Sequence, residues 1–192
     1  MENKKKMSTR TMVTGALLTA IVIILQFLGA SIKLGPFSVS LVLIPIAIGA
    51  ITCGKTIGTW LGFVFGVVVL ASGDAAPFWA VNTPGTIITV LVKGMACGFV
   101  AGLVNEVLVK VTKNSYISAI VAALVCPIVN TGVFLLGCLL FFMKTVTEWA
   151  GGGNVGAYMI LTLVGINFIF EMAVNIICAP AISHIVKVVN KK

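Results

Sequence analysis

Residues 117–143 read ISAIVAALVCPIVNTGVFLLGCLLFFM, a run of 27 residues without a charged side chain. As an α-helix, which rises about 1.5 Å per residue, this run is about 40 Å long and exceeds the roughly 30 Å hydrocarbon core of a bilayer. The run therefore predicts a transmembrane helix and, with it, an integral membrane protein.

Comparable apolar runs recur along the whole chain. They predict further helices at 12–30, 37–53, 56–72, 86–108 and 158–185. Of the 192 residues, 59% are apolar and 9% are charged, whereas soluble domains are roughly 45–50% apolar and about 25% charged. No hydrophilic block of domain size interrupts the pattern. We expect an all-α integral membrane protein, with a six-transmembrane-helix bundle that forms a single membrane domain over residues 1–192.

The basic residues predict the orientation of these six helices. Six crossings place both termini and the even-numbered connections on one side, and Lys and Arg are enriched on the cytoplasmic side of membrane proteins. On the side of the termini lie Lys4, Lys5, Lys6, Arg10, Lys55, Lys110, Lys113, Lys187, Lys191 and Lys192, and on the other side lie Lys33 and Lys144. Both termini are therefore predicted to be cytoplasmic.

Small residues follow a spacing of four in three of the predicted helices. The two glycine series are Gly54, Gly58, Gly62 and Gly66 in helix 56–72, and Gly94, Gly98 and Gly102 in helix 86–108, and helix 12–30 carries Ala16 and Ala20. A spacing of four places these residues on one face, which lets helix backbones approach closely in lipid. We interpret the glycine series as packing faces.

A few polar residues fall at membrane depth. Lys93 lies about 10 Å below the outer end of its helix, and Asn130 and Asn167 come out at similar depths. Asn167, Glu171 and Asn175 form a stripe at a spacing of four. Ionisable residues inside a membrane are costly and usually face a partner, a cavity or a ligand.

Two interpretations of this polar set stay open. Lys93 and Glu171 can form an internal ion pair that fixes helix packing, or they can line an outward-facing pocket in which Lys93 meets an anionic group and the amides bind polar substituents. Outer loops that carry Trp79 and Asn82 could cover such a pocket. The predicted substrate-binding residues are Trp79, Asn82, Lys93, Asn130, Asn167 and Glu171.

Several other functions are excluded by residue type and context. The one histidine and five cysteines show no metal-ligand spacing, so we expect no metal site and no bound cofactor. No nucleophile has a suitable base at membrane depth, so an enzyme is not expected. The basic residues form no patch interleaved with aromatics, which excludes nucleic acid as a partner.

Residues 49–56, GAITCGKT, match the phosphate-binding P-loop pattern, but they lie between two apolar membrane segments instead of after a strand.

The combination of features resembles the substrate-specific S components of energy-coupling-factor (ECF) transporters. The resemblance covers nearly the whole chain and rests on the small-residue pair of helix 12–30, on LIPIAIGA at 43–50 with the glycine series that follows, and on NFIFE at 167–171. It lies closest to the branch of riboflavin, folate and pantothenate subunits. The sequence departs from the family at 53–55, where CGK replaces the more usual Leu-Gly-Pro.

The resemblance implies a function and partners. Such subunits bind a vitamin from outside the bacterial cell membrane and deliver it for ATP-driven uptake by a membrane coupling subunit and two cytoplasmic ATPases. Ala16 and Ala20 would contact the coupling subunit. Lys93 favours a carboxylate-bearing ligand such as pantothenate, with riboflavin next. The alternatives are a solitary small-molecule transporter or channel that acts without ATPases, and a structural membrane subunit.

Overall fold

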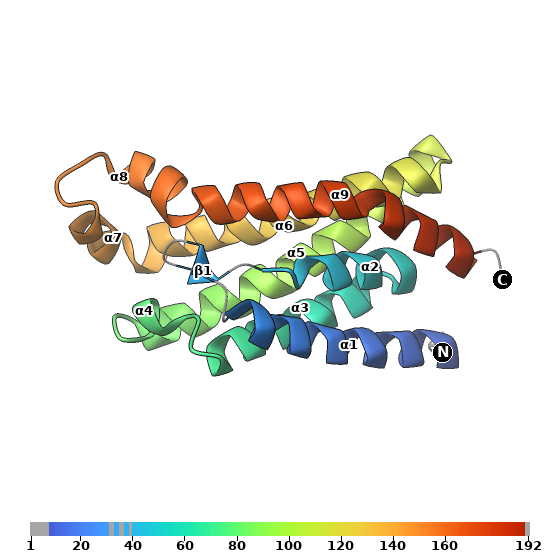
Figure 1. Ribbon diagram of the computed structural model, residues 1–192, viewed down its shortest axis with the longest axis horizontal. Coiled ribbons are helices and arrows are strands. Elements are labelled where there is room, and N and C mark those ends of the chain that lie inside the picture. The colour runs from blue at the N-terminus through green and yellow to red at the C-terminus, as the bar shows by residue number, and fades with distance from the viewer. Residues whose placement is uncertain (1–7, 31–32, 35–36, 39, 191–192) are drawn as a thin grey trace, which may run out of the picture.

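The computed structural model describes residues 8–30, 33–34, 37–38 and 40–190, so that Lys4, Lys5, Lys6, Lys191 and Lys192 lie outside it. Its main helices are α1 (Thr9–Ala30), α2 (Leu43–Cys53), α3 (Lys55–Ala71), α5 (Thr83–Thr112), α6 (Ser115–Phe141) and α9 (Gly165–Asn190), as Figure 1 shows. The remaining elements are α4 (Ala76–Trp79), α7 (Met143–Trp149), α8 (Val155–Ala157), a π-helical turn η1 (Tyr158–Leu163), and the strands β1 (Lys33–Leu34) and β2 (Phe37–Ser38). Apart from this short strand pair, the described chain is helical, as predicted.

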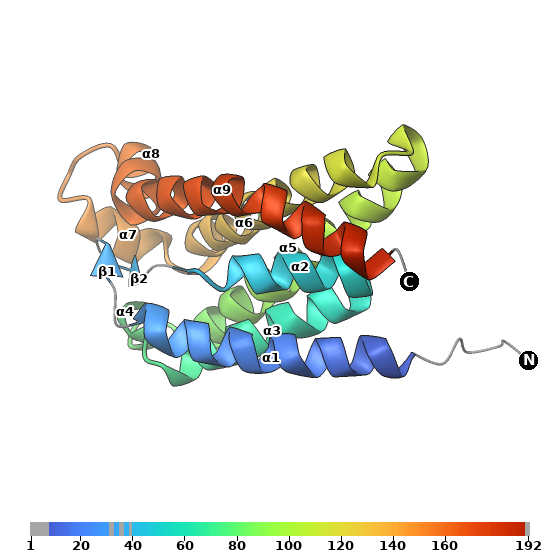
Figure 2. The ribbon, with the colours of Figure 1, turned by 45° about the vertical axis from the view of Figure 1, so that its right-hand side comes forward.

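The two ends of the bundle differ in character. In both views the start of α1 and the end of α9 lie at one end of the bundle, and α4, α7 and α8 lie toward the other (Figures 1 and 2). The predicted helices 12–30, 56–72, 86–108 and 117–143 correspond to α1, α3, α5 and α6, and their ends differ by at most four residues.

Three described helices, α1, α5 and α6, are long and apolar enough to cross a membrane. A fourth span results if residues 155–163 and 165–181 are counted together, although they are bent by 44°. The apolar helices α2 and α3 are shorter, with 11 and 17 residues. These lengths make the protein a multi-pass membrane protein, while six crossings with cytoplasmic termini stay a prediction.

The second helix is shorter than predicted. The sequence predicts a helix over 37–53, but Phe37 and Ser38 pair with β1 in an antiparallel register and α2 begins only at Leu43. Pro45 explains part of this difference, because proline lacks an N–H donor and is tolerated in the first turn of a helix but not in its interior. The helix therefore starts where proline can be accommodated.

This short helix forms the centre of the bundle. It packs against α1, α3, α5, α6 and α9, and its residues Leu43, Ile46, Ala47 and Ala50 are at most 1% exposed. A helix that is apolar on all sides is expected in such a position. The surrounding helices instead turn one apolar face outward, as α1 does with Leu17, Ile24 and Leu28.

The glycine series of α3 and α5 pack directly against each other. A Cβ atom placed on Gly62 would fall on the backbone carbonyl of Gly94, and one placed on Gly94 would fall on the carbonyl of Gly62. Gly58 and Gly98 are related in the same way. The two backbones are therefore in contact, which only residues without side chains permit.

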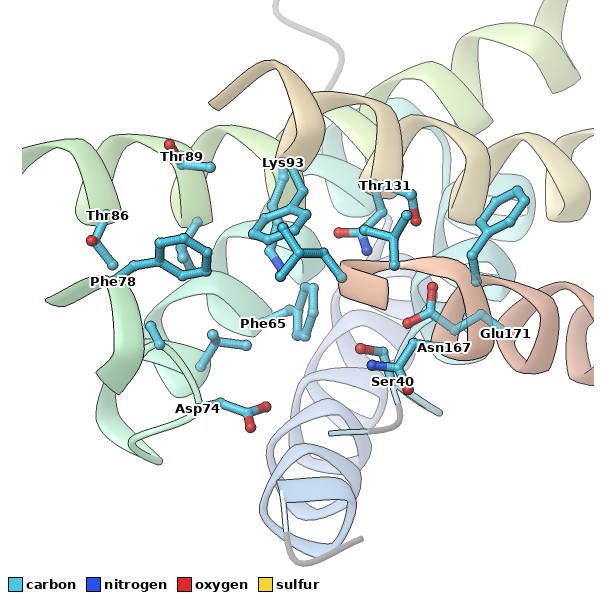
Figure 3. Close-up of a pocket in the computed structure, with 18 of the residues that line it drawn as sticks. Ser40, Phe65, Asp74, Phe78, Thr86, Thr89, Lys93, Thr131, Asn167 and Glu171 are labelled. Atoms are coloured by element: carbon cyan, nitrogen blue, oxygen red, sulfur yellow. The ribbon is translucent and has the colours of Figure 1, made fainter. Parts of the chain in front are cut away.

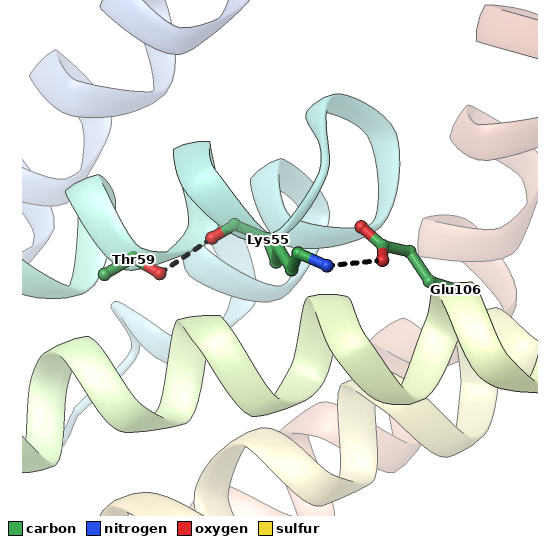
Figure 4. A network of polar contacts seen from close by, with 3 residues as sticks. All are labelled: Lys55, Thr59 and Glu106. Carbon is green, nitrogen blue, oxygen red and sulfur yellow. Dashed lines mark hydrogen bonds and ion pairs between the residues drawn. The ribbon is translucent and has the colours of Figure 1, made fainter.

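An ion pair joins α3 and α5 at the end that carries the termini. The Nζ atom of Lys55 donates to Oε2 of Glu106 at 2.9 Å, and the carbonyl of Lys55 accepts a hydrogen bond from Thr59 (Figure 4). Lys55 belongs to the P-loop pattern, but Gly49 in that pattern is buried inside α2. The lysine thus anchors one helix to another, and the segment forms no phosphate-binding loop.

We predict that Gly62→Ala or Gly94→Ala lowers the free energy of unfolding in detergent by at least about 2 kcal/mol, because the added methyl group meets backbone and cannot be relieved by a side-chain rotation. Gly132→Ala on α6 is the control, since nothing lies within 4 Å of its added Cβ. That variant should be as stable as wild type or more stable by up to about 1 kcal/mol. Equal thermal stability of all three variants would contradict the prediction.

Candidate functional site

A cavity lies between α3, α4, α5, α6, η1 and α9, toward the end of the bundle opposite the termini (Figure 3). Its volume is about 80 Å³, which leaves room for several water molecules at roughly 10–15 Å³ each. The lining is mostly apolar and contains the rings of Phe65, Phe78, Phe134, Phe142 and Phe168. An apolar cavity with a few convergent polar groups is the usual form of a small-molecule site.

Four of the six residues predicted to bind substrate line this cavity. They are Lys93, Asn130, Asn167 and Glu171. They come from three helices that are far apart in sequence, since Lys93 lies on α5, Asn130 on α6, and the other two on α9. Helix packing therefore gathers the polar residues that the sequence places at membrane depth.

Lys93 contributes the cationic group of the cavity. Its Nζ atom lies 5.6 Å from the ring centroid of Phe65 and 5.4 Å from that of Phe134, at distances typical of cation–π contacts. Within the described residues, the one ion pair with a separation of 4.0 Å or less joins Lys55 and Glu106. The direct Lys93–Glu171 pair, one of the two interpretations of the sequence, is therefore not formed.

Two amide side chains extend the polar part of the lining. Asn130 is 5% exposed and Asn167 is 9% exposed, and the Oδ1 atom of each is buried without a hydrogen-bond partner in the described part of the chain. Buried polar groups are normally hydrogen-bonded, so each such atom calls for a specific reason.

Glu171 lies one helical turn beyond Asn167 on the same face of α9, because residues four apart are neighbours on a helix. Its carboxylate accepts hydrogen bonds from the hydroxyl and the backbone N–H of Ser40. Asn175, one turn further, lies outside the lining and donates from Nδ2 to the carbonyl of Glu171 at 2.8 Å. The polar stripe thus begins in the cavity and continues below it.

The side of the cavity nearest α4 and α7 is closed by aromatic rings. Phe78 of α4 is 4% exposed, and its ring centroid lies 4.7 Å from that of Phe142, 5.7 Å from Phe134 and 5.4 Å from Trp149 of α7. These contacts bring together the two connections that carry α4 and α7.

Trp79 and Asn82 do not line the cavity. Trp79 follows Phe78 but is 39% exposed. Asn82 caps α5, with its side chain accepting a hydrogen bond from the backbone N–H of Gly85 at 3.0 Å, which is the common role of asparagine at a helix N-terminus. Of Phe78, Trp79 and Asn82, Phe78 is thus the residue that lines the cavity.

The last predicted helix, 158–185, is interrupted beside the cavity. Residues 158–163 form η1, and α9 starts at Gly165 after the 44° bend. A Cβ atom on Gly165 would lie 2.9 Å from the carbonyl oxygen of Ile160, so glycine allows the close turn. Single π-helical turns are frequent at functional sites, and here Leu163 and Val164 line the cavity.

Sequence reasoning missed several lining residues. Asp74 follows α3, lines the cavity and accepts a hydrogen bond from Nε2 of Gln26 at 3.0 Å. Asp74 is the one aspartate of the chain and follows an apolar segment, so the sequence could have indicated it as a candidate site residue. No such indication exists in the sequence for Thr86, Thr89 and the phenylalanines of the lining, because these residue types are common throughout membrane helices.

Comparison with known proteins identifies the family. A family model described as "ECF transporter, substrate-specific component" matches residues 10–183. The chain belongs to this family. Comparisons with curated proteins and with solved structures gave no significant match. Membership establishes a multi-pass transport protein that binds a small-molecule substrate and works with an ECF module, as the resemblance implied.

We predict that Phe78→Ala opens the side of the cavity nearest α4 and α7 and lowers the free energy of unfolding by about 3 kcal/mol, the range found for truncation of a buried phenylalanine. Trp79→Ala is the adjacent control and should change stability by less than about 1 kcal/mol, since Trp79 is largely outside the core. The fluorescence of Trp149, isolated by replacing Trp60 and Trp79 with phenylalanine, should shift to longer wavelength in the Phe78 variant. An unchanged spectrum would contradict the role of Phe78.

Proposed function

We propose that this chain is the substrate-binding subunit of a bacterial ECF transporter and captures a vitamin or related small molecule from outside the cell membrane. The observation that carries the proposal is the cavity, in which Lys93 forms no ion pair within 4.0 Å among the described residues and the Oδ1 atoms of Asn130 and Asn167 have no hydrogen-bond partner. Such an arrangement is costly at membrane depth and is explained if a polar ligand completes it.

The position of the cavity supports binding from outside. It lies toward the end of the bundle opposite both chain ends, and the excess of basic residues favours a cytoplasmic location for those chain ends. In this proposal six helices cross the membrane, and α4, α7 and α8 face outward. The short helices α2 and α3 cross with the help of the surrounding bundle.

The chemistry of the cavity supports an acidic ligand. Lys93 is the lysine of the lining, and a carboxylate would supply the charge-assisted hydrogen bond that its Nζ atom lacks among the described residues. Pantothenate or another carboxylate-bearing molecule is the first candidate, and riboflavin is the second.

The exposed face of α1 supports docking to a membrane coupling subunit, which works with two cytoplasmic ATPases. Ala16 and Ala20 are both exposed on this face, while Gly15 and Leu18 on the other side are buried against the bundle. Small exposed residues at a spacing of four allow a second helix to approach closely. The interface would thus use the side of α1 that the chain itself leaves open.

Native mass spectrometry of the purified protein tests the binding function. We predict a retained small molecule, or binding of at least one water-soluble B vitamin. Vesicles that contain the chain alone should not accumulate this molecule, and addition of the coupling subunit and ATPases should give ATP-dependent uptake. Absence of any bound molecule would refute the proposal, and uptake by the chain alone would favour the solitary transporter.

A second test concerns the partner surface. We predict that Ala16→Trp or Ala20→Trp abolishes co-purification with the coupling subunit and leaves binding of the small molecule unchanged, because neither residue lines the cavity. Ala173→Trp on the exposed face of α9 is the matched control and should retain the complex. Normal assembly of all three variants would place the coupling interface elsewhere.

A further inference from the structure

The cavity contains both signs of charge on different helices. Lys93 on α5 supplies the ammonium group, and Glu171 on α9 supplies a carboxylate that Figure 3 shows pointing from its helix toward the cavity. The two groups are not within 4.0 Å of each other. They therefore form two separate polar poles with the cavity between them.

The pole at Glu171 is built to accept hydrogen bonds. Two donors from Ser40, its hydroxyl and its backbone N–H, reach this carboxylate. A carboxylate offers about four acceptor positions, so Ser40 leaves part of this capacity unused. Glu171 is 6% exposed and lines the cavity, so a donor in the cavity can reach it.

Two asparagine side chains, Asn130 and Asn167, line the same cavity as Glu171. The Oδ1 atoms of Asn130 on α6 and Asn167 on α9 have no hydrogen-bond partner within the described residues, and an amide side chain both donates and accepts. We refer to Glu171, Asn130 and Asn167 together as the carboxylate wall. Its hydrogen-bond acceptors outnumber its hydrogen-bond donors. Lys93, in contrast, offers donors alone.

We infer that the cavity takes one chemical class of ligand, an acid that also carries N–H or O–H donors at a distance from its acidic group. The acidic group binds Lys93, and the donors bind Glu171 and the amides of Asn130 and Asn167. This inference rests on the proposed function and narrows it, because an acid without donors would leave the carboxylate wall unpaired.

The same geometry disfavours the other ligand types. A neutral flavin provides no countercharge for Lys93. A cation such as thiamine would meet Glu171 favourably but would place a second positive charge beside Lys93, at a cost in binding free energy. Asp74 also lines the cavity, and its Oδ2 atom accepts a hydrogen bond from Nε2 of Gln26 at 3.0 Å.

Matched ligand pairs test the inference on the wild-type protein by calorimetry and thermal shift in detergent. The pairs are pantothenate with pantothenol, and biotin with biotin amide, in which the acid is replaced while the donors remain. Folate, nicotinate, riboflavin and thiamine complete the panel. We expect an acid with donors to bind at least about tenfold more tightly than its matched partner and than nicotinate.

Charge-neutral variants assign the two poles. Lys93→Gln should remove the preference for the acid within a matched pair, and Glu171→Gln should weaken both members of the pair by a similar factor of at least about ten. The controls are Lys55→Gln and Glu106→Gln, which make the same changes in an ion pair outside the cavity and should leave binding unaffected.

The outcomes separate the two levels of the proposal. Tight binding of riboflavin or thiamine alone, or of acid and matched partner equally, overturns the inference and leaves the binding function intact, as does full affinity in Glu171→Gln. A co-purified molecule that lacks either an acidic group or donors overturns it too. If nothing in the panel binds and nothing co-purifies, the proposed function itself fails.

Discussion

The contact between the glycine faces of α3 and α5 is the constraint on which the rest of the structure depends. Gly62 and Gly94 bring the two backbones together, and in lipid such close contact replaces the hydrophobic effect as a source of helix association. Lys93 precedes Gly94, and Phe65 lies next to this contact, so the same approach that joins the helices sets the aromatic ring near the ammonium group. At the other end it brings Lys55 to Glu106.

Much of the fold was predictable because lipid restricts the possibilities. Apolar runs gave the main helices, the spacing of glycines indicated packing faces on α3 and α5 without saying that they meet, and the cost of polar residues in a membrane singled out Lys93, Asn130, Asn167 and Glu171, which the cavity brings together. Hydropathy gave no sign of the π-helical turn, and the late start of α2 was indicated only in part, by Pro45.

The aromatic lining shows a second limit of the sequence. A phenylalanine in an apolar helix has the same signature whether it faces lipid, core or cavity, so Phe65 and Phe78 gave no indication of their position. Conversely, Lys55 belongs to a recognisable motif yet serves helix packing. In a membrane the surroundings of a residue decide its role, and short motifs defined in soluble proteins lose their meaning.

The side of the cavity nearest α4 and α7 is held by ring contacts of Phe78 with Phe142 and Trp149. Contacts of this kind have no fixed donor and acceptor, and separating them leaves no unsatisfied polar group. Aromatic side chains are also favourably placed at the boundary between membrane and water. Separating the rings would therefore break apolar contacts and leave no buried donor or acceptor unpaired, so that this side of the cavity is held by packing alone.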